Sequence, residues 1–290
     1  MTISFFILIA AILLSVPLRI WQYLNLIDPT TGFYSSNHPT IWILAFVLIA
    51  SSLAIVFFTV REKNLMGAPM QYGTKSLGMA YILLSGAMTY SCVQKMLFFV
   101  SNGKTLKDVV FAALSFLCAV SFVILAFLFI VDKTGSVITR ILLIVPVVWS
   151  ISVLWNTFVG YQTILTISEH LFEIVGFIFI VLYNLSFAFV VSGFGAESHQ
   201  KRMMIYGSIG SLFCIMNSVA KIFILIKTKT SIPETLPTYL LYLSFGIFMI
   251  VSIGYLCFGT DRSVPMKAYD EIFDENVELY AEFDRKKDFE

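Results

Sequence analysis

The sequence predicts an all-α integral membrane protein, a polytopic bundle of about eight transmembrane helices. Hydrophobic residues make up 58% of the 290 residues and charged residues only 13%, whereas a soluble domain carries about 25% charged residues. The apolar residues form continuous runs that match the roughly 20 residues a helix needs to cross hydrocarbon. Strands of a membrane barrel would be about half as long and would alternate in polarity. Backbone polar groups in lipid need internal partners, so only helices and closed barrels can span a membrane. Because barrel strands do not fit, the spans are predicted to be helices.

Eight apolar runs are the predicted membrane spans. The spans cover 3–24, 41–60, 77–100, 108–131, 138–158, 169–192, 203–226 and 238–258, and short polar segments separate them. Pro17 and Pro146 fall inside the first and fifth spans. Because proline removes a backbone hydrogen bond and clashes with the preceding turn, we expect a kink at each. The transmembrane bundle is thus predicted to cover 1–258, and 259–290 to form a separate segment.

The distribution of Lys and Arg predicts the orientation in the membrane. An even number of spans places both termini on the same side. That side carries twelve basic residues when 259–290 is included, and the other side carries seven. Basic residues concentrate in cytoplasmic loops, so both termini are predicted to be cytoplasmic. Without 259–290, each side carries seven basic residues, so the C-terminal segment decides the predicted orientation.

The segment 259–290 is acidic and has a helical period. It contains ten acidic and five basic residues, a net charge of −5. Apolar residues recur at spacings of three and four, which is typical of one helix face: Tyr269, Ile272, Phe273, Val277, Tyr280 and Phe283. Helices that lie on anionic lipid are usually basic. We therefore expect a cytoplasmic amphipathic segment that packs on loops or binds a protein partner, with a solvated tail as the alternative.

A parallel four-plus-four repeat is compatible with the sequence. A shift of 126 residues superposes 77–131 on 203–257 and brings Lys95 onto Lys221. Seven of the 55 aligned positions are identical, so the matched lysines carry most of the weight. Because each half would contain an even number of helices, the halves would have the same orientation in the membrane.

Charged and aromatic residues gather at the non-cytoplasmic ends of several spans. Ionisable groups within spans are costly and often mark pathways or ion pairs. Two interpretations fit. One is an interfacial belt, with aromatic residues at headgroup level and lysines that snorkel to the surface. The other is an outward-facing cavity that binds a polar ligand, for which the candidate residues are Arg19, Lys95, Trp155, Glu169, Glu173 and Lys221.

Metal and cofactor motifs do not support a further site. Glu169, His170 and Glu173 are residue types that bind metals, but they form no HExxH or similar pattern. The four cysteines are dispersed within apolar runs without CxxC spacing, and we expect them to be small core residues. We therefore expect no metal and no other cofactor.

Several small or polar residues lie in the middle of spans. We expect five of them to form hydrogen bonds between helices: Ser85, Tyr183, Asn184, Ser211 and Asn217. Gly207, Gly210 and Gly254 are expected to mark places where helices approach closely. Both expectations concern packing and assign no ligand.

The stretch LRIWQYLNLIDPTTGFY at 18–34 resembles the start of a group of multi-pass membrane proteins of Firmicutes. The resemblance covers the first span and the loop that follows it. It implies location in a bacterial plasma membrane. The group has no assigned activity, so no functional residue is transferred from it.

The absence of catalytic motifs narrows the functional classes. The sequence contains no GxxxxGK[ST] phosphate loop, no serine elbow and no paired mid-span aspartates, so we do not expect an enzyme. No basic patch with interleaved aromatics predicts a nucleic-acid partner. Two classes remain. The protein is either a small-molecule transporter or permease component, or a sensor or accessory subunit that binds a ligand outside and a protein through the acidic segment.

Overall fold

The computed structural model confirms the all-α bundle. It describes residues 2–27, 34, 38–62, 75–102, 106–131, 136–160, 168–192, 196–228 and 236–258. Eight helices lie within these ranges: α1 (Thr2–Asn25), α2 (Pro39–Arg61), α3 (Lys75–Asn102), α4 (Leu106–Ile130), α5 (Val137–Gly160), α6 (Ser168–Val191), α7 (Ala196–Thr228) and α8 (Leu236–Phe258). Each is long and apolar enough to cross a membrane. The predicted acidic segment, 259–290, lies outside the described residues.

The predicted boundaries agree with the helices except at the start of α7. The apolar run begins at 203, whereas the helix begins at Ala196. The intervening AESHQKR is polar, but most of its residues are good helix formers, so the helix continues beyond the hydrocarbon. Helices α1 and α5 continue through Pro17 and Pro146. The kinks expected there stay predictions.

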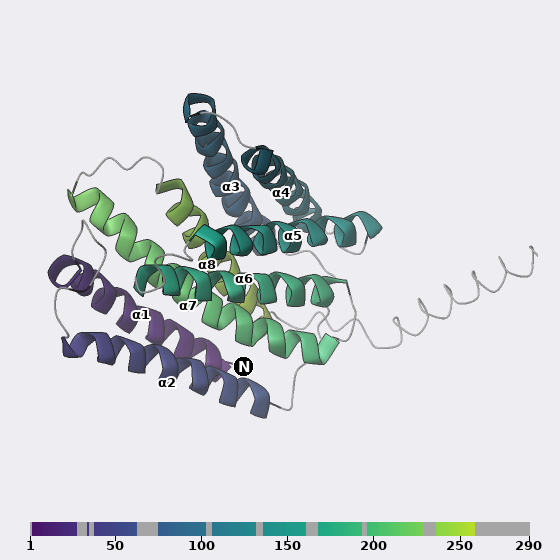
Figure 1. Ribbon diagram of the computed structural model, residues 1–290. Helices are drawn as coiled ribbons and strands as arrows, with labels where there is room; N and C mark the ends of the chain where they lie inside the picture. The colour runs from purple at the N-terminus through teal and green to yellow at the C-terminus, as the bar shows by residue number, and fades with distance from the viewer. Residues whose placement is uncertain are drawn as a thin grey trace, which may run out of the picture. The chain divides into compact units, whose positions relative to one another are not determined.

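Six of the helices form a closed ring. Each of α3 to α8 packs against the next, and α8 packs against α3 to complete the ring. Helices α1 and α2 form a hairpin that packs on the outside of this ring, mainly through α1 against α7 (Figure 1). Helix α7 therefore belongs to both the ring and the seam with the hairpin.

Aromatic side chains fill the interior of the ring. Tyr81 is buried, and its ring centroid lies 4.4 to 6.3 Å from those of Phe122, Phe129, Phe187 and Phe248. Trp149 of α5 stacks on Phe245 of α8 at 5.7 Å, with 6° between the ring planes. Pairs of this kind contribute about 0.5–1.5 kcal/mol beyond their area. The centre of the ring is thus a packed core.

A second apolar cluster joins the hairpin to α7. It consists of buried residues from α1, α2, α7 and α8: Leu8, Ala11, Leu44, Leu48, Ile55, Met204, Leu212, Met216 and Ile253. Within the hairpin, the Thr59 hydroxyl of α2 donates to the Ser4 hydroxyl of α1 at 3.1 Å. The hairpin is therefore anchored by its own core, separate from that of the ring.

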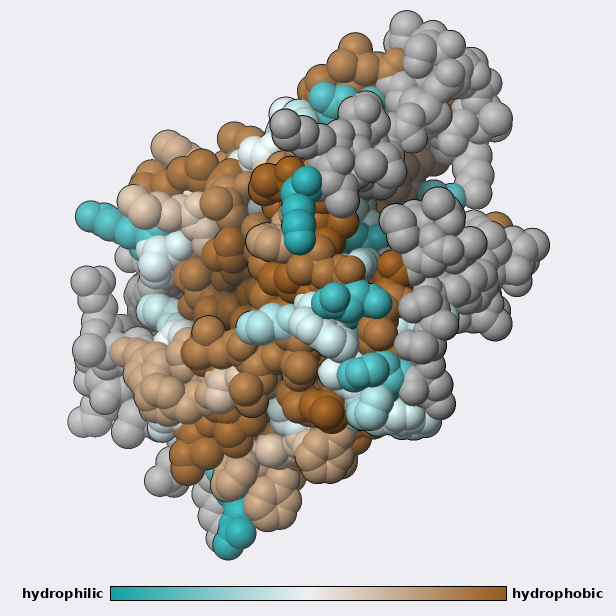
Figure 2. Space-filling model, turned by 90° about the vertical axis from the view of Figure 1, so that its left-hand side faces the viewer, coloured by the Kyte–Doolittle hydropathy of each residue, from teal (hydrophilic) through white to brown (hydrophobic). Residues whose placement is uncertain are grey.

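The outward faces of the helices are apolar. Phe46 and Leu53 of α2 are 72% and 65% exposed, and large exposed hydrophobics occur on all eight described helices. Hydrophobic side chains cover most of the face in Figure 2, with hydrophilic groups as small patches. Soluble monomers rarely expose such areas. These faces therefore meet lipid, and the chain is a multi-pass membrane protein.

Three of the five mid-span polar residues form the expected bonds between helices. Tyr183 and Ser252 share a hydrogen bond of 2.6 Å. Asn184 donates to Ser150 at 3.5 Å, and Asn217 accepts from Tyr23 at 3.4 Å. In an apolar environment each such bond spares two polar groups from being left unmatched. The prediction is confirmed for these three residues.

The prediction is wrong for the two serines. Ser85 donates to the carbonyl of Ile82, and Ser211 donates to the carbonyl of Ser208, both within their own helices. A serine hydroxyl is short enough to return to the preceding turn of its own helix. The larger Tyr and Asn side chains reach across the interface instead.

Close packing is confirmed at Gly207 and wrong at Gly254. A Cβ at Gly207 would lie 2.8 Å from the Tyr183 ring and 3.0 Å from Ile253, whereas one at Gly254 would lie 3.7 Å from Phe5, an ordinary contact. We expect Gly207→Val to lower the free energy of unfolding by about 2 kcal/mol, since overpacking costs about 1–3 kcal/mol. The thermal midpoint in detergent measures this change.

Gly86 of α3 provides the matched control. No described atom lies within 4 Å of a Cβ placed there, and Gly86→Val makes the same change in helix propensity. We expect its midpoint to stay near that of the parent protein. Equal midpoints for the two variants would contradict the close approach at Gly207.

Candidate functional site

Arg19, near the end of α1, is a buried charged residue. Its side chain is fully buried, and Nη1 donates to Gln22 Oε1 at 3.0 Å and to the Tyr34 hydroxyl at 2.8 Å. Nη2 reaches the Tyr23 hydroxyl at 3.5 Å. Gln22 and Tyr23 follow Arg19 by three and four positions, so they share its helix face. The sequence RIWQY thereby builds a local set of acceptors for the guanidinium.

Aromatic rings cover the guanidinium of Arg19 as well. Its Cζ lies 4.6 Å from the centroid of Tyr23 and 4.8 Å from that of Phe172. Cation–π contacts reach about 2 kcal/mol where the cation is desolvated. Because Phe172 belongs to α6, this contact ties the hairpin to the ring.

The end of α1 is also fixed to the residues that follow it. Gln22 Nε2 donates to the Thr40 carbonyl at 3.0 Å, and the Tyr34 hydroxyl donates to Gln22 Oε1 at 3.2 Å. Ile27 and Tyr34 form an antiparallel bridge. These bonds hold the end of α1 against the start of α2 and keep Tyr34 within reach of Arg19.

Tyr23 connects the hairpin to α7. Its hydroxyl donates to Asn217 Oδ1 at 3.4 Å, and Lys221 Nζ lies 5.0 Å from its ring centroid. Asn217 and Lys221 are four residues apart and share one face of α7. Tyr23 therefore contacts Arg19 of its own helix and both Asn217 and Lys221 of α7.

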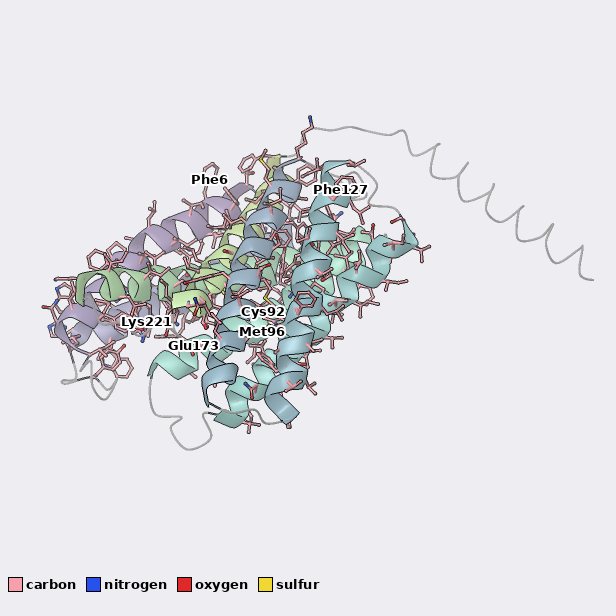
Figure 3. The ribbon with its side chains drawn as sticks, turned by 90° about the horizontal axis from the view of Figure 1, so that it is seen from above. Phe6, Cys92, Met96, Phe127, Glu173 and Lys221 are labelled. Carbon is pink, nitrogen blue, oxygen red and sulfur yellow. The ribbon has the colours of Figure 1, made fainter. Side chains whose placement is uncertain are left out.

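Tyr239 of α8 connects the same lysine to a carboxylate. Lys221 Nζ lies 5.7 Å from the Tyr239 ring centroid, and the Tyr239 hydroxyl donates to Glu173 Oε1 at 3.4 Å. Lys221 and Glu173 are labelled in Figure 3. Arg19, Tyr23, Glu173, Lys221 and Tyr239 form what we call the tyrosine-linked cluster. It joins α1, α6, α7 and α8 at one end of the bundle.

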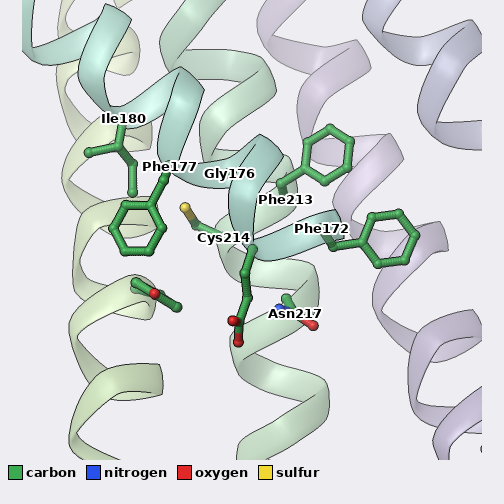
Figure 4. A pocket seen from close by; sticks show the side chains of 9 residues that line it. Phe172, Gly176, Phe177, Ile180, Phe213, Cys214 and Asn217 are labelled. Atoms are coloured by element: carbon green, nitrogen blue, oxygen red, sulfur yellow. The ribbon is translucent and has the colours of Figure 1, made fainter. Parts of the chain in front are cut away.

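A pocket adjoins the tyrosine-linked cluster. Three helices line this small pocket (Figure 4): Phe172, Glu173, Gly176, Phe177 and Ile180 from α6, Phe213, Cys214 and Asn217 from α7, and Tyr242 from α8. Besides the Tyr242 hydroxyl, its polar groups are one carboxylate and one amide. Apolar walls with a few convergent polar groups are typical of small-molecule sites.

Asn217 brings an unused hydrogen-bond donor to this pocket. The side chain is 2% exposed, and within the described part of the chain its Nδ2 has no acceptor. The Tyr23 hydroxyl receives a bond from Arg19, so its own hydrogen is directed at Asn217 Oδ1, which leaves Nδ2 for the pocket. A buried polar group without a partner costs about 1–3 kcal/mol. An acceptor atom of a bound ligand would recover that cost.

The structure brings together three of the six candidate residues. Arg19, Glu173 and Lys221 belong to the tyrosine-linked cluster. Lys95 does not join them among the described contacts; its Nζ lies 4.8 Å from the ring of Phe111 of α4. Trp155 is 68% exposed on α5, as expected for the interfacial belt. The side chain of Glu169 lies outside the described residues.

Sequence reasoning did not place three residues of this region in the candidate site. Tyr23 follows Arg19 by four residues and Asn217 precedes Lys221 by four, so helix spacing could have indicated both. The bond between helices that was predicted for Asn217 is present, but its contribution to a pocket was not foreseen. Tyr239 carries no such signal, because only the packing of α8 on α7 brings it to Lys221.

The donor set of the site does not form a metal centre among the residues that the structure describes, where no three His, Cys, Asp or Glu side chains come together. The side chains of Glu169 and His170 lie outside those residues. No protein family model, curated protein or solved structure matches the chain. Fold and surface define its class as a multi-pass membrane protein.

Proposed function

We propose that the protein is a small-molecule transporter or permease component that takes up its ligand at the pocket beside the tyrosine-linked cluster. One observation carries this proposal. A buried, unused donor of Asn217 and the carboxylate of Glu173 converge on one pocket. Polar groups are expensive in a membrane bundle and tend to mark sites of function.

The location of the site beside the seam between two packing units supports transport. The tyrosine-linked cluster spans the seam between the hairpin and the ring, and α7 belongs to both. Transporters commonly expose a site to alternate sides by moving one bundle of helices against another. A ligand held between Glu173 of α6 and Asn217 of α7 would lie next to the seam that such a motion changes.

Location and orientation belong to the same proposal. We place the protein in a bacterial plasma membrane with both termini in the cytoplasm, so that the pocket faces outward. The excess of basic residues on the terminal side, including 259–290, supports this orientation. In this proposal the protein moves a ligand across the membrane and catalyses no chemical reaction.

The matched lysines test the site. In a thermal-shift panel of amino acids, amines, carboxylates and sugars, we expect at least one compound to stabilise the parent protein. Lys221→Met should abolish that shift, because Lys221 adjoins Asn217 and contacts Tyr239, the partner of Glu173. Lys95→Met removes the same charge over Phe111 and should retain the shift. A shift retained in both variants would contradict the site.

The acidic segment favours a second candidate, a sensor or accessory subunit. Its net charge of −5 and its apolar stripe suit a cytoplasmic protein partner. Accumulation of a stabilising compound inside proteoliposomes would establish transport. Binding without accumulation, together with capture of a cytoplasmic partner that deletion of 259–290 abolishes, would instead establish the second candidate.

A further inference from the structure

We infer that the pocket beside the tyrosine-linked cluster binds one ordered water molecule. This water accepts a hydrogen bond from Asn217 Nδ2 and donates one to the carboxylate of Glu173. The inference concerns a binding site of the protein at rest and holds whether or not the protein transports. It follows from the buried donor of Asn217, from the size of the space beside it and from the polar groups that line that space.

The donor of this site is Asn217 Nδ2. The side chain is 2% exposed, and none of the residues that the structure describes provides an acceptor for this atom. Its Oδ1 accepts from the Tyr23 hydroxyl at 3.4 Å, which orients the amide. Buried polar side chains nearly always have a partner, and an ordered water serves where no protein group does. A water at Nδ2 therefore completes the hydrogen bonding of this amide.

The free space beside this donor fits about one water molecule. Apolar cavities stay dry, whereas a water-sized space with two or more polar partners holds a water. Most of the residues around the space are buried in the bundle: Gly176, Phe177, Ile180, Cys214, Asn217 and Tyr242. A water held there is thus a buried one.

Three polar side chains line the space. Asn217 provides the donor, Glu173 a carboxylate, and Tyr242 a hydroxyl that can donate or accept. A carboxylate accepts several hydrogen bonds at once, so the bond that Glu173 receives from Tyr239 at 3.4 Å is compatible with another from a water. Because the space is that of a single molecule, a water in it lies close to the groups that line it.

Water suits this lining better than a small ion does. A cation would meet the N–H group of Asn217 and the nearby charges of Arg19 and Lys221, which both contact Tyr23. An anion would meet the carboxylate of Glu173. Water accepts and donates, so it matches the amide and the carboxylate together. Its immobilisation costs no more than one unmatched buried donor, and the water also gains a bond to a charged group.

The water completes a hydrogen-bonded path through four helices. Arg19 and Tyr23 of α1 lead to Asn217 of α7. The water continues the path to Glu173 of α6, which accepts from Tyr239 of α8. A single exchangeable molecule thus links the hairpin side of the tyrosine-linked cluster to its ring side. A ligand larger than water would have to displace this molecule and widen the pocket.

Radiolytic hydroxyl-radical labelling of the full-length protein in nanodiscs tests the inference, because a bound water generates the radical beside the side chains that it touches. Cys214 lines the pocket, whereas Cys118 belongs to the packed core of the ring. The two thiols are matched in burial, at 5% and 0% exposed. We expect Cys214 to be oxidised about tenfold faster than Cys118, around which side chains pack closely. Equal rates would overturn the inference.

A substitution of the donor assigns the labelling to the water. Asn217→Leu replaces the amide by an apolar group of similar size and should reduce the oxidation of Cys214 to the level of Cys118. Asn184→Leu is the matched control, since it removes a buried amide that bonds to Ser150 outside the pocket lining. It should leave the oxidation of Cys214 unchanged. Undiminished oxidation of Cys214 in folded Asn217→Leu protein would overturn the inference.

Gly176→Ala replaces this test if Asn217→Leu does not fold. The added methyl group would lie 3.8 Å from Cys214 Sγ, an ordinary contact, and would occupy space in the pocket that Gly176 lines. The oxidation of Cys214 should fall to the level of Cys118. Gly86→Ala makes the same change outside the pocket lining and should leave it unchanged. Equal oxidation of Cys214 in the two alanine variants would overturn the inference.

The outcomes separate this inference from the proposed function. If Cys214 is oxidised no faster than Cys118 but a compound accumulates in proteoliposomes, the water site fails and transport stands. If the labelling shows the water and no compound accumulates, the water site stands and transport fails.

Discussion

Replacement of Trp149 by alanine is expected to lower the free energy of unfolding by about 3 kcal/mol, in the range of buried aromatic truncations. The side chain is 1% exposed, stacks on Phe245 and donates from Nε1 to the Ser115 hydroxyl at 3.1 Å. Lipid is as apolar as the core, so transfer from water adds little in a membrane. The cost arises from the cavity and from lost dispersion contacts within the ring.

Trp155 is the matched control on the same helix. It is 68% exposed, so Trp155→Ala makes the same chemical change on a lipid-facing surface. Its expected effect is within about 0.5 kcal/mol. Thermal or denaturant unfolding in detergent measures both variants. Equal losses would contradict an aromatic core that holds the ring together.

Arg19→Met should cost about 2–4 kcal/mol, the second large effect. The change removes the donor to Gln22 Oε1 and to Tyr34, and it ends the cation–π contacts with Tyr23 and Phe172. Lost hydrogen bonds to a charged group cost about 1.5–3 kcal/mol, and desolvated cation–π contacts about 2 kcal/mol. Arg19→Lys should recover only part of this, since an ammonium cannot reproduce the planar fork.

Arg61 of α2 is the control for Arg19. It is exposed, and its guanidinium lies 5.9 Å from the Phe57 ring centroid, a weak contact. Arg61→Met is therefore expected to change the unfolding free energy by less than about 0.5 kcal/mol. The unfolding assay used for the tryptophan pair also applies here. A loss in Arg19→Met no larger than in Arg61→Met would show that Arg19 does not hold the hairpin to the ring.

The helices could be predicted from sequence because hydropathy depends only on local composition. The same locality explains why helix spacing relates Arg19 to Tyr23 and Asn217 to Lys221. The approach of Glu173 and Tyr239 to these residues could not be predicted. It depends on which helices pack together, and the apolar outward faces of the spans do not specify neighbours.

The two aligned lysines show the same limit. Lys95 lies over Phe111 of the next helix, and Lys221 lies over Tyr239 of the next helix, so their local surroundings are similar, as the 126-residue shift suggests. Their wider surroundings differ, because α1 packs on α7, whereas α3 packs on α8. The shift alone therefore does not indicate that Lys221, and not Lys95, contacts Tyr23 of α1. The repeat itself stays a prediction.

The packed centre of the ring has a consequence for the path of a solute. Passage through the centre would require several interlocked aromatic rings to separate, beginning with those around Tyr81. The seam between the hairpin and the ring offers a different course, because Arg19 and Tyr23 of α1 meet Phe172 of α6 and Asn217 of α7 there. If the protein transports, turnover should be limited by rocking of the hairpin against α6 and α7, while the aromatic core remains intact throughout the cycle.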